Sequence, residues 1–158
     1  MAWRGLLRTH ALVIDRLDTE LRQRHGIPLD WYDVLVQLHE AGGDRTMSEL
    51  AEALLIVSPS SCTRLVDRLV AAGLVRREVD PEDARVKHAV LTPEGKAVLR
   101  RAAPTHLAGI RRWFTGLLEP GEAAQLSALN ARILERLDGR VIDTSTLDTS
   151  TLDTRVKG

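Results

Sequence analysis

Apolar residues recur at intervals of three and four along most of the chain, which is the spacing of one face of a helix. The first such stripe predicts a helix from about residue 2 to Gly26, where Gly26 and then Pro28 interrupt the pattern. A second helix follows, and we expect the side chain of Asp30 to cap it. The last third of the sequence predicts two further helices, over about 93–118 and 120–138.

Short polar signals mark two more helices in the middle of the sequence. Thr46-Met47-Ser48-Glu49 has the form of a capping box, in which each outer side chain bonds the backbone amide of the other. It predicts a short helix that ends near Leu55. Ser58 and Pro59 give a second start signal, with the serine as N-cap, and Gly73 gives the stop. The apolar stripe of this helix consists of Cys62, Leu65, Val66, Leu69 and Val70.

The spacing changes from helical to alternating directly after Gly73. Residues 74–79 and 88–91 alternate apolar residues with charged or polar ones, as strands do, and the segment DPEDARVK separates them. This pattern predicts a two-stranded hairpin with a long charged tip. We therefore expect a mainly α fold (α+β), in which residues 30–92 form a winged helix-turn-helix DNA-binding lobe.

The outer helices carry apolar faces that so small a lobe cannot cover. We expect residues 1–29 and 93–138 to pack together and against a second copy of the chain, as an intertwined homodimer interface. Pro104 lies inside one of these helices and should kink it. Residues 139–158 hold a Thr/Ser/Asp-rich repeat with little to bury, and we expect this tail to be mobile.

Composition limits the possible functions. The 158 residues are 44% hydrophobic with a net charge of zero, so any contact with nucleic acid must come from local charge. Aromatic residues make up 3% of the chain, too few for the stacking platforms of single-strand binders. The single cysteine, Cys62, excludes an intramolecular disulfide, and no apolar run approaches the roughly 20 residues of a membrane span. We expect a cytoplasmic protein.

Local positive charge gathers around the predicted helix and hairpin, where six lysines and arginines fall within 24 positions. The first turn of a helix presents free amides to phosphate, and arginine can bond guanine through two hydrogen bonds. An arginine at the hairpin tip, Arg85, suits the minor groove, and Asp83 can hold it or the tip in place. Our candidate DNA-binding residues are Ser58, Ser60, Ser61, Thr63, Arg64, Arg68, Arg77, Asp83, Arg85 and Lys87.

Other kinds of site have weaker support. We find no glycine-rich phosphate loop, nucleophile motif or paired carboxylates, so we predict no enzyme activity and no cofactor. The five histidines show no metal-ligand spacing, and Cys62 on an apolar stripe is expected to be packing rather than a redox sensor. The candidate residues for a small-molecule effector site are His10, Trp31, Tyr32 and Trp113.

Two functional classes remain open on these residues alone. The first is a regulator that binds double-stranded DNA. The alternative is a winged-helix module for protein–protein contact, for which the serines would serve only as caps and Arg64 would be a solvated helix residue. A basic helix face and a charged hairpin favour DNA, because a contact module would more often expose an apolar wing.

The run SPSSxTRLVDRLxxxGLVRR, followed by DPxDxR and VxLTPEG, resembles the MarR (multiple antibiotic resistance regulator) family. The resemblance covers about residues 5–138 and is strongest over 46–95. It implies a homodimeric winged helix-turn-helix regulator, usually a repressor, that binds a short pseudo-palindrome. Many members release DNA on binding a small ligand or on cysteine oxidation.

By position, the resemblance assigns residues 58–72 to the groove-reading helix and Arg85 to the wing. It assigns the first helix and the two after Pro93 to the dimer interface. One departure is that alanine and valine flank Arg85, where many members have another arginine or a small polar residue. The threonine-rich tail is not part of the family pattern.

Overall fold

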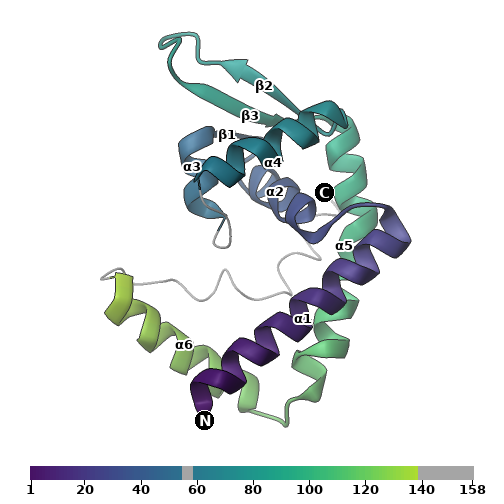
Figure 1. Cartoon of the computed structure of the whole chain (residues 1–158), viewed down its shortest axis with the longest axis vertical. Helices are drawn as coiled ribbons and strands as arrows, with labels where there is room; N and C mark the ends of the chain where they lie inside the picture. The colour runs from purple at the N-terminus through teal and green to yellow at the C-terminus, as the bar shows by residue number, and fades with distance from the viewer. Residues whose placement is uncertain (55–58, 139–158) are drawn as a thin grey trace. The chain divides into compact units, whose positions relative to one another are not determined.

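The computed structural model describes residues 1–54 and 59–138 (Figure 1). Ser58 and the repeat after residue 138 lie outside the described residues, so the predictions made for them stay untested. The elements are α1 (Ala2–His25), α2 (Leu29–Glu40), β1 (Asp44–Thr46), α3 (Met47–Ala53), α4 (Pro59–Ala71), β2 (Val75–Val79), β3 (Lys87–Leu91), α5 (Pro93–Trp113), the 3-10 turn η1 (Thr115–Leu117) and α6 (Glu122–Asp138).

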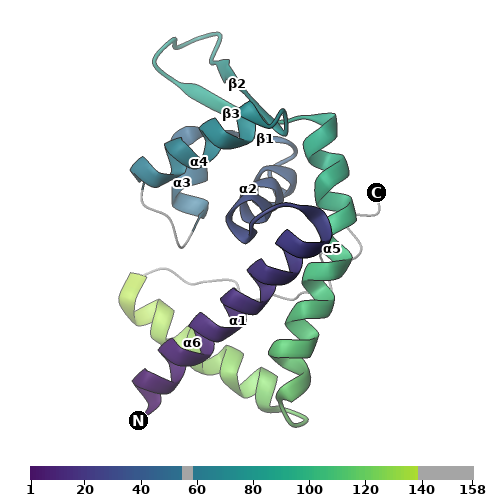
Figure 2. The ribbon, with the colours of Figure 1, turned by 45° about the vertical axis from the view of Figure 1, so that its right-hand side comes forward.

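The chain divides into two compact units, of which one is Leu21–Ala102 and the other consists of the segments before and after it. Within Leu21–Ala102, three short strands form an antiparallel sheet in the order β1-β3-β2. α3 and α4 pack against each other and against α2, and α4 also contacts β2. Figure 2 shows α4 beside the β2–β3 hairpin. The predicted winged helix-turn-helix fold is confirmed.

The core of this unit is formed by one apolar face from each helix. Val34, Leu35 and Leu38 of α2 are fully buried, as is Leu50 of α3. Burial of such side chains stabilises the unit by about 1.5–3 kcal/mol each. The predicted capping box is also present: the Glu49 amide donates to Thr46 Oγ1 at 3.2 Å, and the Thr46 amide donates to Glu49 Oε2 at 2.9 Å.

Several boundaries differ from the sequence predictions. Asp30 does not cap α2, because the helix begins two residues earlier than that prediction, at Leu29, and Pro28 occupies the cap position without a side-chain bond. Val70 is 37% exposed, so it leaves the buried stripe of α4. The penultimate helix ends at Trp113, and α6 begins at Glu122 because Gly121 adopts a left-handed backbone with φ of +89°. Strand β1 was not predicted.

Two glycines fix the connection from α4 to α5. Gly73 ends α4 with φ of +73°, the left-handed conformation expected of a C-terminal stop. The Thr92 hydroxyl donates to the Gly73 carbonyl at 2.8 Å and accepts from the Gly95 amide at 3.0 Å. A Cβ on Gly95 would lie 2.1 Å from the Leu74 carbonyl oxygen. The first turn of α5 therefore needs a glycine at this position.

The second unit contains the first part of α1, the second part of α5, and α6. Glu20 of α1 accepts hydrogen bonds from Arg112 Nη1 and Trp113 Nε1, both at 2.9 Å. The Arg16 guanidinium lies 5.4 Å from the centre of the Trp113 ring. Pro104 lies inside α5, and the kink expected there stays a prediction. In the described residues, no helix is long and apolar enough to cross a membrane.

We predict that Gly95→Ala lowers the free energy of unfolding by about 1–3 kcal/mol, because the added methyl group would collide with backbone. Gly5→Ala is the matched control, since nothing lies within 4 Å of a Cβ at Gly5 in α1. That control should be neutral or stabilising by up to about 1 kcal/mol. Urea denaturation measures both, and equal stabilities of the two variants would contradict the close approach at Gly95.

Candidate nucleic-acid interface

α4 buries one face and exposes the other. Cys62, Leu65, Val66 and Leu69 are each at most 1% exposed, so their packing sets the rotation of the helix. The opposite face carries the polar residues predicted to meet DNA. Ser60, Thr63, Arg64 and Arg68 are exposed and Ser61 is half-buried. The structure thus brings these five candidates together on one surface of α4.

A hollow of about 620 Å³ lies along this polar face. It is lined by Asp30, Ser61, Arg64, Leu65, Asp67 and Arg68. Arg68 Nη2 is 3.4 Å from Asp30 Oδ2 across the hollow, and the two side chains are 61% and 43% exposed. Such an exposed pair contributes little to stability. Arg68 can therefore exchange this carboxylate for a phosphate at small cost.

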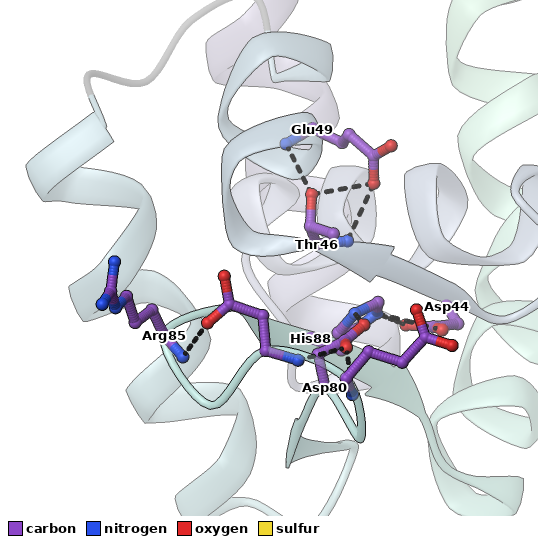
Figure 3. Close-up of polar contacts among 8 residues, drawn as sticks. Asp44, Thr46, Glu49, Asp80, Arg85 and His88 are labelled. Carbon is purple, nitrogen blue, oxygen red and sulfur yellow. Dashed lines mark hydrogen bonds and ion pairs between the residues drawn. The ribbon is translucent and has the colours of Figure 1, made fainter.

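The wing tip is held by two carboxylates that accept from backbone amides (Figure 3). Asp80 Oδ1 accepts from the amides of Glu82 at 2.8 Å and Asp83 at 3.0 Å. These two hydrogen bonds are the main cause of the lowered pKa of Asp80. Asp83 Oδ1 accepts from the Arg85 amide at 2.9 Å. Asp83 thus shapes the backbone of the tip, and Arg85 is exposed.

A second hollow, of about 470 Å³, separates the wing from the helix-turn-helix. It is lined by Thr46, Met47, Ser48, Thr63, Arg77, Arg85, Val86 and Lys87. Three cations from the hairpin face polar residues from the start of α3 and from α4. The arrangement matches what a sugar–phosphate backbone requires, namely positive charge beside hydroxyl and amide donors.

Arg77 occupies a different position from the other candidates. Its Nη2 donates to the Thr63 carbonyl at 3.2 Å and lies 3.1 Å from Asp67 Oδ1. The side chain is 28% exposed, and its buried Nε has no hydrogen-bond partner in the described residues. Arg77 therefore joins β2 to α4, and its contribution to DNA binding stays a prediction. Burial raises the pKa of the Cys62 thiol on the same helix.

The four candidate effector residues are divided between the two units. His10 and Trp113 belong to one unit, where His10 is exposed and Trp113 bonds Glu20. Trp31 and Tyr32 belong to the other, where Trp31 is half-buried and Tyr32 is 1% exposed. Burial raises the pKa of the Tyr32 hydroxyl. The effector role of these residues stays a prediction.

Sequence reasoning missed two sets of titratable groups. Burial and the nearby Asp30 raise the pKa of Asp33 to about 6. His88 contacts Asp44 and Asp80 at the base of the wing, and no sequence signal placed Asp44 on a strand. No group of three or more His, Cys, Asp or Glu side chains in residues 1–54 and 59–138 is arranged so that it could hold a metal ion.

A helix with a polar outer face, presented by a helix-turn-helix beside a charged hairpin, defines the winged helix-turn-helix class of DNA-binding proteins. A sequence model of a protein family, described as "MarR family", matches residues 25–86 of this chain. An HTH-type transcriptional regulator of Bacillus subtilis, YkoM, is 35% identical over 107 residues, which are 68% of each protein. The regulator PecS of Dickeya dadantii is 30% identical over 84% of this chain and 80% of its own length.

Solved structures agree with this classification. AbsC, a MarR family transcriptional regulator from Streptomyces coelicolor, matches with a TM-score of 0.80 at 37% identity, over 88% of this chain and 93% of its own. Sco3205 from the same organism was solved in complex with DNA. It matches with a TM-score of 0.79 at 36% identity, over 86% of this chain and 85% of its own. The chain belongs to the MarR family of transcriptional regulators.

We predict that Arg77→Ala lowers the free energy of unfolding by about 1–2 kcal/mol, because it removes a hydrogen bond and a partly buried ion pair. Arg64→Ala is the control, since Arg64 is exposed on the same surface. It should change stability by no more than about 0.5 kcal/mol. Guanidinium denaturation compares the two, and an unchanged midpoint for Arg77→Ala would show that its contacts contribute nothing to the fold.

Proposed function

We propose that this DNA-binding regulator is a homodimeric repressor that recognises a pseudo-palindromic operator and releases it on binding a small molecule. The observation that carries the proposal is the exposed polar face of α4 beside an arginine-bearing wing. In this proposal residues 30–92 bind DNA, and residues 1–29 with 93–138 form the dimer.

Recognition depends on a few placed side chains, because the net charge of the whole chain is zero. Ser60 and Ser61 lie in the first turn of α4, where the positive end of the helix dipole favours phosphate. Thr63 and Arg64 point from the next turn toward base edges in the major groove. Arg85 enters the minor groove from the exposed wing tip, where narrow A·T tracts attract guanidinium groups.

Exposed apolar side chains support the dimer. Leu129, Ile133 and Leu137 recur at four-residue intervals on α6 and are 46%, 53% and 75% exposed. α1 exposes Trp3, Leu6, Leu7 and Leu12 in the same way. A continuous apolar stripe of this kind is uncommon on a monomer and is typical of a helical interface. Two-fold symmetry then places two copies of α4 about 34 Å apart, one DNA turn.

The effector site is a separate part of the proposal. It rests on four residues, His10, Trp31, Tyr32 and Trp113, whose rings and polar tips suit a small aromatic ligand. A ligand that binds the DNA-free state more tightly than the DNA-bound state would lower the affinity for the operator. The factor equals the ratio of the ligand's affinities for the two states. Thermal stabilisation by candidate phenolic compounds, lost in Trp113→Ala, tests this role.

DNA selection tests the regulator directly. The chain should enrich an inverted repeat from a random duplex library, and it should shift DNA flanking its own gene. Arg85→Ala should weaken binding by about 1–3 kcal/mol without changing stability. Arg76→Ala on β2 is the control, since Arg76 is paired with Glu78 and is not among the candidate DNA-binding residues.

The salt dependence separates this proposal from a protein-contact module. Specific binding should weaken steeply as the salt concentration rises. The reason is that each lysine or arginine that contacts a phosphate releases the counterion condensed there. Weak, sequence-indifferent binding would contradict the proposal. The alternative module would then have to show a protein partner in a pull-down with the full chain.

We predict that Ile133→Asp converts the dimer to a monomer, because it places a charge in the centre of the α6 stripe. Ser127→Asp is the matched control, since this exposed residue of α6 lies on the other side of the helix. Sedimentation equilibrium measures both variants. A wild-type chain that is monomeric at micromolar concentration would contradict the proposed interface.

A further inference from the structure

The base of the wing carries a polar cluster on the sheet face that does not meet the core. His88 of β3 lies directly opposite Thr46 of β1 and Glu78 of β2. The next residue, Ala89, points to the other face and is fully buried. The His88 side chain is 20% exposed, so it is enclosed by its neighbours without entering the core.

Both ring nitrogens of His88 face carboxylate oxygens (Figure 3). Nδ1 is 2.9 Å from Asp44 Oδ1 and 3.1 Å from Asp44 Oδ2, and Nε2 is 3.1 Å from Asp80 Oδ2. A neutral imidazole has one N–H and could donate to only one of these carboxylates. The imidazolium has two and can donate to both. The geometry therefore fits protonated His88.

Asp80 connects this contact to the wing tip. Its Oδ2 contacts His88, while its Oδ1 accepts from the amides of Glu82 and Asp83. Asp83 in turn accepts from the Arg85 amide. A chain of hydrogen bonds thus runs from β1 through His88 to the backbone of Arg85, the residue expected to enter the minor groove.

We propose that His88 is a positioning residue that, when protonated, joins Asp44 to Asp80 and so orders the wing for DNA. The proposal rests on the proposed DNA-binding function. A wing ordered before binding loses less conformational entropy in the complex, so affinity should rise as the pH falls. We call the three residues Asp44, His88 and Asp80 the wing latch.

The surrounding charges favour the protonated ring. Besides Asp44 and Asp80, Glu78 lies opposite His88, and Glu49 of α3 is near enough for His88 to lower its pKa. The positive charge of Arg76 disfavours a protonated ring, but Arg76 is paired with Glu78. The hydrogen bond with Asp44, and then that with Asp80, raise the pKa of His88 above 6.5 despite partial burial.

The raised pKa of His88 determines how the wing latch depends on pH. A histidine whose pKa is higher in the folded protein stabilises the fold fully below the unfolded pKa of 6.5. The contribution is lost as the pH rises through the higher, folded value. The wing latch should therefore be closed below pH 6.5 and should open as the pH rises through the raised pKa of His88.

A simple charge effect must be distinguished from ordering of the wing, because protonated His88 would also attract phosphate. Asp80→Asn separates the two, since asparagine keeps an oxygen for the amides of Glu82 and Asp83 but cannot pair with the imidazolium. Removal of a negative charge alone would tighten DNA binding. Loss of the wing latch would weaken it. Glu82→Gln is the control, because it removes the same charge from an exposed side chain of the wing tip, and Glu82 bonds Asp80 through its backbone amide.

The first experiment follows the full-length free protein by NMR, from about pH 5 to pH 9, around the ordinary histidine pKa. The His88 ring should titrate above 6.5, with a lower pKa in Asp44→Asn, and the Glu82 and Asp83 amides should lose hydrogen-exchange protection over the same range. Titration at or below 6.5, or protection unchanged through the His88 titration, would overturn the proposal.

The second experiment measures affinity for a duplex of about 30 base pairs, long enough for two half-sites, recovered from the random library. At about pH 6 and constant ionic strength, Asp80→Asn should bind about fivefold more weakly than wild type, the low end of typical couplings. His88→Gln should lose most of the pH dependence, and His39→Gln should keep it. Tighter binding by both Asp80→Asn and Glu82→Gln would overturn the proposal in favour of simple charge.

The two experiments distinguish the possible failures. If the wild-type chain selects no DNA sequence at any pH, the proposed function fails, and the NMR titration still decides whether the wing latch exists. If the chain selects DNA but His88→Gln keeps the wild-type pH profile, the function stands and the positioning role of His88 is wrong.

Discussion

The burial of one face of α4 is the constraint on which the rest of the binding lobe depends. Cys62, Leu65, Val66 and Leu69 are almost inaccessible to solvent, and each packs with neighbours that the other elements supply. A rotation by one residue, about 100°, would expose this stripe and bury the polar residues between. The same packing that stabilises the lobe therefore orients Thr63 and Arg64 outward. One face of α4 packs in the core, and the opposite face carries the residues proposed to recognise DNA.

Much of this fold follows from short-range signals in the sequence. The capping box at Thr46 and the left-handed Gly73 depend on residues within one turn, so the sequence alone places them. β1 could not be found in this way. Its three residues have no strand pattern of their own, and they are extended because they pair with β3 more than 40 positions away. The error at Asp30 is also local, since Pro28 with φ of −74° already provides the entry to α2.

The candidate site was predictable in outline but not in its internal contacts. An exposed Arg85 at a charged tip and a polar face on α4 follow from spacing and composition. The ion pair between Arg77 and Asp67 does not, because it depends on which side of β2 meets the helix. The contact between His88 and Asp44 joins residues 44 positions apart through a strand that the sequence did not reveal. Contacts of this kind need the register of the sheet.

The pairing of arginines with carboxylates has a consequence for how the chain searches a genome. Arg68 and Arg77 each have an aspartate partner in the free protein, Asp30 and Asp67. A cation that already has a carboxylate partner displaces fewer condensed ions when it reaches a phosphate, so under the proposed function we expect these pairs to lower the attraction to arbitrary duplex. Fewer molecules would then be held on the very large excess of non-operator sites, and more would stay free to find the proposed operator. Under the proposed function, a low background of this kind adds to discrimination without any new contact in the operator complex.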